Sequence, residues 1–265
     1  MVAATGRVVL KSAREIELMR AAGRVVHRVL CELETLVRPG VTTAELAQRA
    51  EEIIRAAGGE ALFRGVRHAQ ARFPFPACIC TSVNEEVVHG IPGDRALRAG
   101  DIISIDCGVR LRGYCGDAAA TVPVGAVPRE VQRLIDVTRA ALDTALAEMR
   151  PGRRWSEVAR QVQRCVEDAG FGVVREFCGH GIGQQMHEFP NVPNYYDRSQ
   201  RNLDFELVPG TTLAVEPMVT AGRAEVMFAD DSGWTVVTKD GSRAAHFEHT
   251  VAVTEHGVDV LTDGR

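Results

Sequence analysis

The chain has 265 residues, of which 45% are hydrophobic and 25% are charged, and its 31 basic and 35 acidic side chains give a net charge of −4. These globular proportions exclude collagen-like and disordered proteins, and the slightly acidic balance argues against direct binding to nucleic acid. No apolar run approaches the roughly 18 residues of a membrane helix, and the first residues lack the apolar core of a signal peptide. Seven cysteines without a Cys-x-x-Cys pair predict reduced thiols in a soluble cytoplasmic protein that does not contact membranes.

The first half begins with two predicted helices. Residues 12–36 place apolar side chains at helical spacing, and Ser12 with Glu15 forms a capping box at the start. The sequence Arg-Pro-Gly ends this helix, and Thr43 is expected to open a second helix that closes at Gly58 or Gly59.

The second half repeats this order at a constant offset. A helical stretch over 128–149 is again followed by Arg-Pro-Gly, and Ser156 opens a further helix. The two Arg-Pro-Gly sequences begin at 38 and 150, and the closing glycines stand at 58 and 170, so both offsets are 112. A constant offset predicts an internal duplication, although two unrelated helix pairs with common turn residues remain the alternative.

Strand-like stretches follow each helix pair, at 79–91, 101–125, 211–220, 233–242 and 244–258. Helices followed by strands in both halves predict the α+β class, with the helices on one face of a largely antiparallel sheet. We therefore expect an N-terminal arm over residues 1–11 and a single domain over residues 12–265 made of two related halves.

Four acidic residues stand inside or at the end of apolar strand-like runs: Asp106, Asp117, Glu216 and Glu248. If Leu111 and Arg112 form the turn of a hairpin, Asp106 pairs with Asp117, and their carboxylates repel each other unless a cation lies between them. Each acid alone is better explained as a residue at a sheet end or facing solvent than as a functional one. Because no basic residue stands near Glu216 or Glu248 in their runs, the four together predict a metal site.

Histidines add candidate nitrogen ligands. His180 and His187 stand in a segment with three glycines, which exclude a stable helix and predict a tight loop leading into a strand. His89 follows an apolar strand at a Gly/Pro turn, where a hydrogen-bonded loop residue is the alternative to a functional one. The same alternative holds for the remaining histidines, with more doubt for the two that flank Glu248: His27, His68, His246, His249 and His256.

The residue types of this cluster indicate its metal class. Several carboxylates and one imidazole form an oxygen-rich site that suits Mn²⁺, Fe²⁺ or Co²⁺ and tolerates Zn²⁺. Four carboxylates balance the charge of two divalent ions better than that of one, and two neighbouring ions can share a bridging water. The residues themselves thus predict a hydrolytic metal centre.

Six motifs then resemble, in order, the type I methionine aminopeptidases of bacteria: VNEEVVHGIP, ISIDCGV, GYCGD, CGHGIGQQMHEFP, AVEPMV and FEHTVAVT. The opening helices resemble them too, so that the resemblance extends from about Lys11 to Val253. It implies a pita-bread fold, in which two pseudo-twofold-related helix pairs cover a curved antiparallel sheet. It also implies removal of the N-terminal methionine from nascent proteins by metal-activated water, with a small second residue preferred.

The same resemblance implies a role for each acidic residue and for His180. Asp106 would chelate one ion, Asp117 and Glu248 would bridge two, and His180 with Glu216 would complete the shell of the second. The expected cofactor is therefore a pair of divalent ions, Co²⁺, Mn²⁺, Fe²⁺ or Zn²⁺.

The resemblance further implies a catalytic set of His89, His187 and Glu216. Glu216 would relay a proton from the water to the departing amine, and the two histidines would contact the substrate. The methionine side chain would enter an apolar pocket, for which the candidates are Phe75, Cys80, Met186 and Trp234, with Phe73 equally well explained as core. The partners would be the N-termini of nascent polypeptides at the ribosome, and a monomer is the expected state.

Three positions depart from the family pattern. The segment 71–78 replaces a Tyr-His-Gly-aromatic-Pro run, alanines follow Asp117 where a hydroxyl residue is common, and His246 replaces a usual Gln. Two alternatives stay open. Xaa-Pro dipeptidases and aminopeptidases share the ligand set but carry a large extra N-terminal domain, and non-catalytic modules of this fold typically lose ligands that are all present here.

Overall fold

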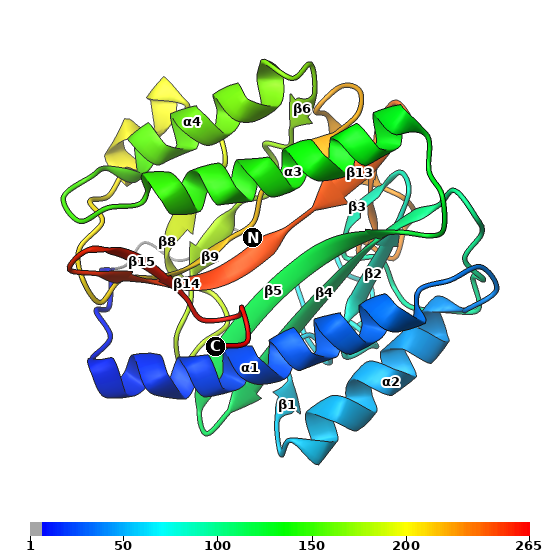
Figure 1. Cartoon of the computed structure of the whole chain (residues 1–265), viewed down its shortest axis with the longest axis horizontal. Coiled ribbons are helices and arrows are strands. Elements are labelled where there is room, and N and C mark those ends of the chain that lie inside the picture. The colour runs from blue at the N-terminus through cyan, green and yellow to red at the C-terminus, as the bar shows by residue number, and fades with distance from the viewer. Residues whose placement is uncertain (1–6) are drawn as a thin grey trace.

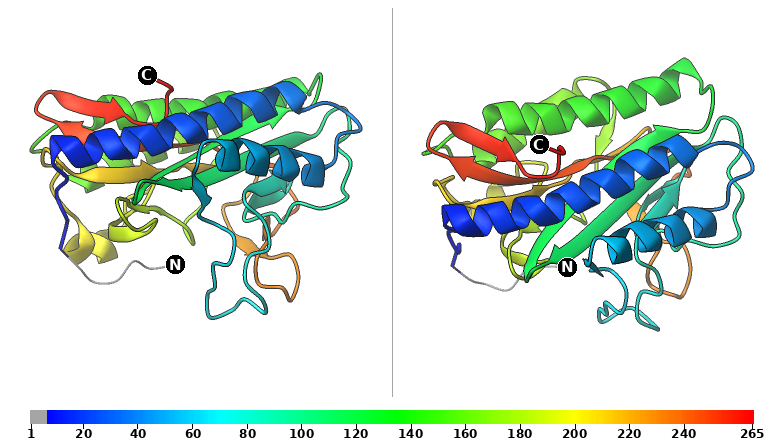
Figure 2. Two further views of the ribbon diagram at one scale, coloured as in Figure 1. Left: turned by 90° about the horizontal axis from the view of Figure 1, so that it is seen from below. Right: turned by 60° about the horizontal axis from the view of Figure 1, so that its bottom comes forward.

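Four helices flank the sheet in a computed structural model that describes residues 7–265, so residues 1–6 of the expected N-terminal arm lie outside the described residues. They are α1 (Ala13–Leu36), α2 (Thr43–Ala56), α3 (Arg129–Glu148) and α4 (Trp155–Glu167). Figures 1 and 2 show the long helices α1 and α3 on the same face of the sheet, with the C-terminal segment between them and long loops on the opposite face. Across residues 7–265, no helix is both long enough and apolar enough to cross a membrane.

Local capping boxes set the starts of α1 and α2, whereas a distant residue caps α4. Ser12 and Glu15 form the predicted capping box of α1. Helix α2 opens at Thr43 as predicted, and its cap is Thr42, whose hydroxyl accepts from the Glu45 N–H. Helix α4 begins before Ser156, whose N–H donates to Asp204 Oδ1 at 2.9 Å, so a carboxylate from a distant segment caps this helix.

The helix ends repeat at the predicted positions. Gly40 after α1 and Gly152 after α3 have φ angles of 93° and 82°, in the left-handed region that favours glycine. These turns hold each pair of helices in a similar arrangement. The internal duplication and the single domain over 12–265 stay predictions that these local similarities do not test.

Every strand pair among residues 7–265 is antiparallel, as predicted. The main sheet has nine strands, and its central path runs β1-β4-β5-β14-β9-β7-β8, with β2 on β4 and β15 on β14. Its strands are β1 (Glu60–Ala61), β2 (Cys80–Val83), β4 (Ile102–Leu111), β5 (Tyr114–Pro123), β7 (Gly179–Gly181), β8 (Glu188–Val192), β9 (Thr212–Val215), β14 (Glu248–Thr254) and β15 (Gly257–Val260).

Two three-stranded sheets complete the fold, in the orders β13-β10-β6 and β11-β12-β3. Their strands are β3 (Glu86–Val88), β6 (Gly172–Val173), β10 (Met218–Thr220), β11 (Val226–Phe228), β12 (Val236–Thr238) and β13 (Ala244–His246), and a 3₁₀ helix spans Arg198–Leu203. The buried apolar side chains form one large cluster under α3 and α4 and another under α1 and α2. The helices thus bury one face of the main sheet, which leaves the other face for a functional site.

The hairpin of β4 and β5 corrects the predicted register. Its turn is Arg112–Gly113, with φ angles of 53° and 83°, so that Leu111 pairs with Tyr114. A two-residue hairpin turn with positive φ at both central positions matches the twist of the two strands. The predicted turn at Leu111 and Arg112 would have left Gly113 outside the turn. Asp117 therefore pairs with Gly108, two residues from the predicted partner Asp106. The shift of two residues keeps both acids on one face of the sheet.

Candidate metal centre

A row of three residues crosses the centre of the main sheet on the face away from the helices. Asp106 on β4 and Glu248 on β14 both pair with Ala119 on β5, which lies between them. Glu248 is 3% exposed and Ala119 is 3% exposed. Because the middle side chain is a single methyl group, the space between the two carboxylates stays open.

Asp117 lies diagonally to Asp106 in the same hairpin. Its partner is Gly108, where a Cβ atom would lie 3.2 Å from Asp117 Oδ1 and 2.8 Å from the Phe63 ring. Thr250 on β14 fixes the Asp117 backbone, since its hydroxyl accepts from the Asp117 N–H at 2.9 Å and donates to the Asp117 carbonyl at 2.8 Å. The glycine leaves room for this carboxylate, and the neighbouring strand holds it in place.

His180 lies within a strand and not in the predicted loop. It is the middle residue of β7, which is hydrogen-bonded to β8 and β9, and Cβ atoms on Gly179 or Gly181 would collide with the carbonyl groups of those strands. The glycines thus permit close strand packing and not a turn at this position. His180 Nδ1 lies 2.9 Å from the Gly181 carbonyl oxygen, an acceptor, so Nδ1 carries the proton and Nε2 is free to bind a metal.

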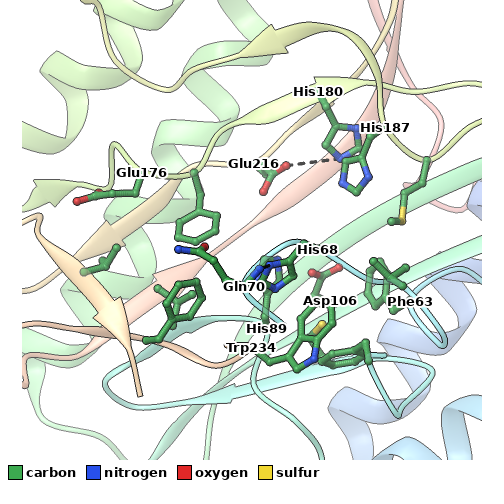
Figure 3. A pocket seen from close by; sticks show the side chains of 18 of the residues that line it. Phe63, His68, Gln70, His89, Asp106, Glu176, His180, His187, Glu216 and Trp234 are labelled. Atoms are coloured by element: carbon green, nitrogen blue, oxygen red, sulfur yellow. Dashed lines mark hydrogen bonds and ion pairs between the residues drawn. The ribbon is translucent and has the colours of Figure 1, made fainter. Parts of the chain in front are cut away.

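Glu216 stands between β9 and β10 and reaches the same space. The side-chain amide of Asn194 donates to its carbonyl at 3.0 Å, which fixes the backbone where the two strands meet. Glu216 Oε1 lies 3.7 Å from His180 Nε2, and the dashed line in Figure 3 joins these groups. A fifth protein group therefore converges on the site predicted from the sequence.

Burial raises the pKa of all four carboxyl groups. The pKa of Asp117 rises to about 7 through desolvation. Desolvation and then the neighbouring Asp117 carboxylate raise the pKa values of Asp106, Glu216 and Glu248 well above their usual range. Burial also lowers the pKa of His180 to about 3, which keeps its imidazole neutral. Close carboxylates and a neutral imidazole are the electrostatic conditions that a divalent cation relieves.

Unsatisfied polar atoms support the same conclusion. Asp106 Oδ1, Asp117 Oδ1 and Glu248 Oε1 are buried and have no hydrogen-bond partner among the described residues. One ligand atom each from Asp117, His180 and Glu248 lies within 4.8 Å of the others, as expected for side chains that could share one ion. These residues, with Asp106 and Glu216 beside them, fit a metal centre of carboxylate and imidazole ligands.

A cavity of about 640 Å³ opens onto this cluster. Its wall contains all four predicted pocket residues, Phe75, Cys80, Met186 and Trp234. In Figure 3, Glu216 and His180 lie on one side of the cavity, and Asp106 and Trp234 lie on the other. The Phe73 side chain is instead 41% exposed and outside the cavity wall, and its carbonyl accepts from Trp234 Nε1 at 2.9 Å.

His89 and His187 also line the cavity. His89 has a φ angle of 59°, a left-handed conformation that is uncommon for histidine and is found mostly at turns and functional sites. Its ring meets the edge of Phe177 at a centroid distance of 5.6 Å, and burial lowers its pKa to about 4. The His187 ring lies 4.3 Å from the His180 ring, so it stands beside the candidate ligand.

Several residues of the cavity were not predicted as site residues, including Phe63, His68, Gln70, Glu176, Phe177 and Phe228. His68 meets Trp234 edge to face at 4.5 Å, although its sequence position suggests only an ordinary loop residue. The rest come from segments without a motif, and their place depends on how distant loops fold together. His246, predicted as a hydrogen-bonded residue, is 1% exposed and its Nε2 lies 3.7 Å from Glu216 Oε2.

Comparison with known proteins places this geometry in a family. Residues 17–255 match the sequence profile of metallopeptidase family M24. The chain belongs to this family. A methionine aminopeptidase of Bacillus subtilis is 47% identical over 255 residues, which are 96% of this chain and 99% of that protein. The resemblance to the bacterial methionine aminopeptidases, predicted from the sequence motifs, is confirmed.

Solved structures of a methionine aminopeptidase and of a prolidase have the same fold. The methionine aminopeptidase of Thermotoga maritima superposes with a TM-score of 0.90 at 39% identity, covering 97% of this chain and 99% of that one. The prolidase of Pyrococcus horikoshii superposes with a TM-score of 0.74 at 19% identity, and the match covers only 64% of that chain. The pita-bread fold predicted for this M24 family member is therefore confirmed.

Proposed function

We propose that this M24 metallopeptidase is a methionine aminopeptidase, which removes the N-terminal methionine from nascent polypeptides. The observation that carries the proposal is a buried cluster of four carboxylates and an imidazole at an apolar cavity. Relatives that are named methionine aminopeptidases match nearly their full length. A prolidase function has less support, since the match to a solved prolidase covers only 64% of that chain.

Two divalent ions fit the ligand set that we assign. Asp106 would chelate one ion, Asp117 and Glu248 would bridge both, and His180 with Glu216 would complete the second. Four carboxylates balance the four positive charges, and Co²⁺, Mn²⁺, Fe²⁺ and Zn²⁺ all accept oxygen and imidazole ligands. When bound, such ions lower the pKa of a water molecule and supply a nucleophile for peptide hydrolysis.

Three protein side chains would handle the proton and the substrate. Glu216 would accept a proton from the water and pass it to the departing amine. His187, beside His180, would donate a hydrogen bond to the scissile carbonyl oxygen and stabilise its developing charge. His89 would donate to the substrate near the scissile nitrogen from the opposite wall of the cavity.

The apolar part of the cavity supports the proposed preference for methionine. Phe75, Cys80 and Trp234 are nearly fully buried and form an apolar cluster with the partly buried Met186. An unbranched thioether side chain would pack against these aromatic and sulfur-containing groups. The free α-amino group would then lie at the carboxylate end of the cavity, which restricts cleavage to the first residue, and a small second residue would fit best.

We further propose that the enzyme acts as a monomer in the cytoplasm on the N-termini of nascent polypeptides at the ribosome. It would have no direct contact with nucleic acid or membranes. The reduced state of the cysteines agrees with this compartment, since all seven cysteines within residues 7–265 are free.

Peptide hydrolysis after metal exchange tests the proposal. Protein stripped with a chelator and resupplied with Mn²⁺ or Co²⁺ should release methionine from Met-Ala-Ser and leave a Met-Leu-Ser peptide almost uncleaved. Cleavage of Xaa-Pro dipeptides with Met-Ala-Ser left intact would favour the prolidase alternative. If neither substrate is hydrolysed after Mn²⁺ or Co²⁺ is resupplied, the enzymatic proposal is refuted and a non-catalytic module is favoured.

A further inference from the structure

His246 ends β13 beside the metal centre and has no role in the function proposed above. Its side chain is 2% exposed, and its Nε2 lies 3.7 Å from Glu216 Oε2 and 4.0 Å from Glu248 Oε2. This nitrogen has no hydrogen-bond partner among the described residues. A buried polar atom without a partner costs free energy, so its direction toward two candidate ligands calls for an explanation.

The backbone of His246 is held firmly, so the direction of its side chain is a property of the sheet. The Thr121 hydroxyl accepts from the His246 N–H at 2.9 Å and donates to the His246 carbonyl at 2.8 Å. Ser104 Oγ lies 2.9 Å from the same hydroxyl and serves as its donor. His246 also pairs in register with Met218, two residues after Glu216. Neighbouring strands thus place the imidazole against the Glu216 carboxylate.

The chemistry of the neighbouring atoms decides the form of the imidazole. Both atoms near Nε2 are carboxylate oxygens, which can only accept hydrogen bonds when ionised. A lone pair on Nε2 would repel them, whereas an N–H would attract them. Bound divalent cations nearby would also disfavour a charged imidazolium, so the neutral ring with its proton on Nε2 fits this position.

We propose that His246 is a positioning residue for Glu216, with Nε2–H donating to Glu216 Oε2 in the metal-loaded protein. A shift of under about 1 Å brings the 3.7 Å separation into hydrogen-bonding range. Glu216 lies between two imidazoles, with Oε1 near His180 and Oε2 near His246. The hydrogen bond therefore holds Oε1 toward the metal. This inference rests on the proposed metal centre and not on the choice of peptide substrate.

Two substitutions at this position separate a hydrogen-bond donor from other roles. His246→Gln keeps an N–H donor and removes the imidazole, whereas His246→Leu keeps the size and removes the donor. His249→Gln is the matched control, because His249 lies three residues further on and its Nδ1 contacts Thr262 Oγ1 at 2.8 Å, away from the cavity wall. Titration calorimetry of Mn²⁺ into chelator-stripped protein measures metal affinity directly, and circular dichroism checks that each variant folds.

We expect His246→Leu to weaken Mn²⁺ binding by about 10-fold or more, as for loss of a hydrogen bond to a metal ligand. His246→Gln and His249→Gln should stay within about threefold of the wild type. For Met-Ala-Ser, His246→Leu should lower kcat with little change in KM, and His246→Gln should restore it.

Unchanged Mn²⁺ affinity in His246→Leu would overturn the proposal. So would an equal loss in His246→Gln, because it would show that the imidazole itself is required. If the leucine variant does not fold, His246→Met tests the same loss of a donor. The calorimetric result needs no peptide, so it stands even if the wild-type protein cleaves no methionine substrate.

Discussion

Asp106 and Glu248 flank the same alanine from opposite sides. Both pair in register with Ala119, Asp106 from β4 and Glu248 from β14, although 142 residues (248 − 106) separate them in the chain. Asp106 Oδ1 and Glu248 Oε1 are both buried without a hydrogen-bond partner among the described residues. The methyl group between them thus leaves the space that the proposed ions need.

Filling that space should weaken metal binding with little loss of folding. Ala119→Val adds two methyl groups between the carboxylates, and valine suits a β-strand. We expect the affinity for Mn²⁺ to fall by at least about 10-fold, measured by calorimetry on chelator-stripped protein. The metal-free variant should unfold within a few degrees of the wild type, since overpacking at one site costs about 1–3 kcal/mol.

The neighbouring Ala120 provides a matched control. It is partly exposed and packs against the cluster of apolar side chains under α3 and α4, on the opposite face of β5. Ala120→Val should therefore change stability by a similar amount and leave Mn²⁺ affinity unchanged. Wild-type affinity in Ala119→Val would contradict the placement of the ions over this row.

Removing one charge from the cluster should separate metal binding from folding. Asp106→Asn keeps the side-chain volume and relieves repulsion from Asp117 and Glu216, which contribute to the raised pKa of Asp106. In metal-free protein the variant should be at least as stable as the wild type. Saturating Mn²⁺ at about 100 times Kd should stabilise the wild type by about 2.7 kcal/mol and the variant much less. Turnover of Met-Ala-Ser should fall by about a hundredfold or more.

Thermal unfolding with and without Mn²⁺ measures this difference. Asp101→Asn is the control of the same chemistry, because Asp101 accepts hydrogen bonds from Asn84 at 2.8 Å and from the Arg98 N–H at 2.9 Å, outside the cavity wall. It should keep the full Mn²⁺-dependent stabilisation. An equal stabilisation of Asp106→Asn would exclude Asp106 as a ligand.

Local patterns predicted the helices and the acidic residues well, because their signals lie within a few neighbouring residues. The capping box of Ser12 and Glu15 is one such signal, and acids inside apolar runs are another. Recognition of the family then followed from ordered motifs, including those around Asp106 and His180. The family and the fold are confirmed, whereas the roles of the individual site residues stay predictions.

The remaining features depend on contacts between distant segments. The turn at Arg112–Gly113 was misplaced because either of two adjacent residue pairs could have closed the hairpin. Asp204 caps α4 from 48 residues away, which no local pattern indicates. The sequence raises doubt about His246 because it flanks Glu248 but assigns it no role, and the pairing of β13 with β10 brings it to Glu216. Sheet order, which sequence periodicity does not determine, decides such neighbours.

The apolar wall of the cavity should control the affinity for methionine. Trp234 meets Phe75 edge to face at 5.1 Å, and its indole N–H donates to the Phe73 carbonyl at 2.9 Å. Trp234→Phe removes this hydrogen bond and part of the wall. We expect KM for Met-Ala-Ser to rise by about 10-fold with kcat nearly unchanged, because the lost contacts act equally in the ground and transition states.

Trp155→Phe is the matched control for this change. Trp155 also donates an indole hydrogen bond, to the Pro193 carbonyl at 2.9 Å. It does not line the cavity that opens onto the metal centre. It should lower the unfolding temperature without raising KM. Steady-state kinetics in which both variants change KM alike would show that the effect comes from general loosening of the fold.

The buried carboxyl of Asp117 should make the metal-free protein lose stability as the pH rises. Its pKa is raised from 3.8 to about 7 by desolvation, so between these values the folded state holds a proton that the unfolded state has released. The free energy of unfolding from this group therefore falls by up to about 1.4 kcal/mol per pH unit across that window and is constant above it. Asp117→Asn carries no such proton, so its stability advantage over the wild type should grow from about pH 4 to pH 7. Buried histidines respond to pH in both proteins alike and cancel in this difference, whereas Asp106, Glu216 and Glu248, whose pKa values the Asp117 charge raises, add to it. Urea unfolding of chelator-stripped protein measures it, and an advantage that is constant with pH would show that Asp117 is already ionised in the folded cluster.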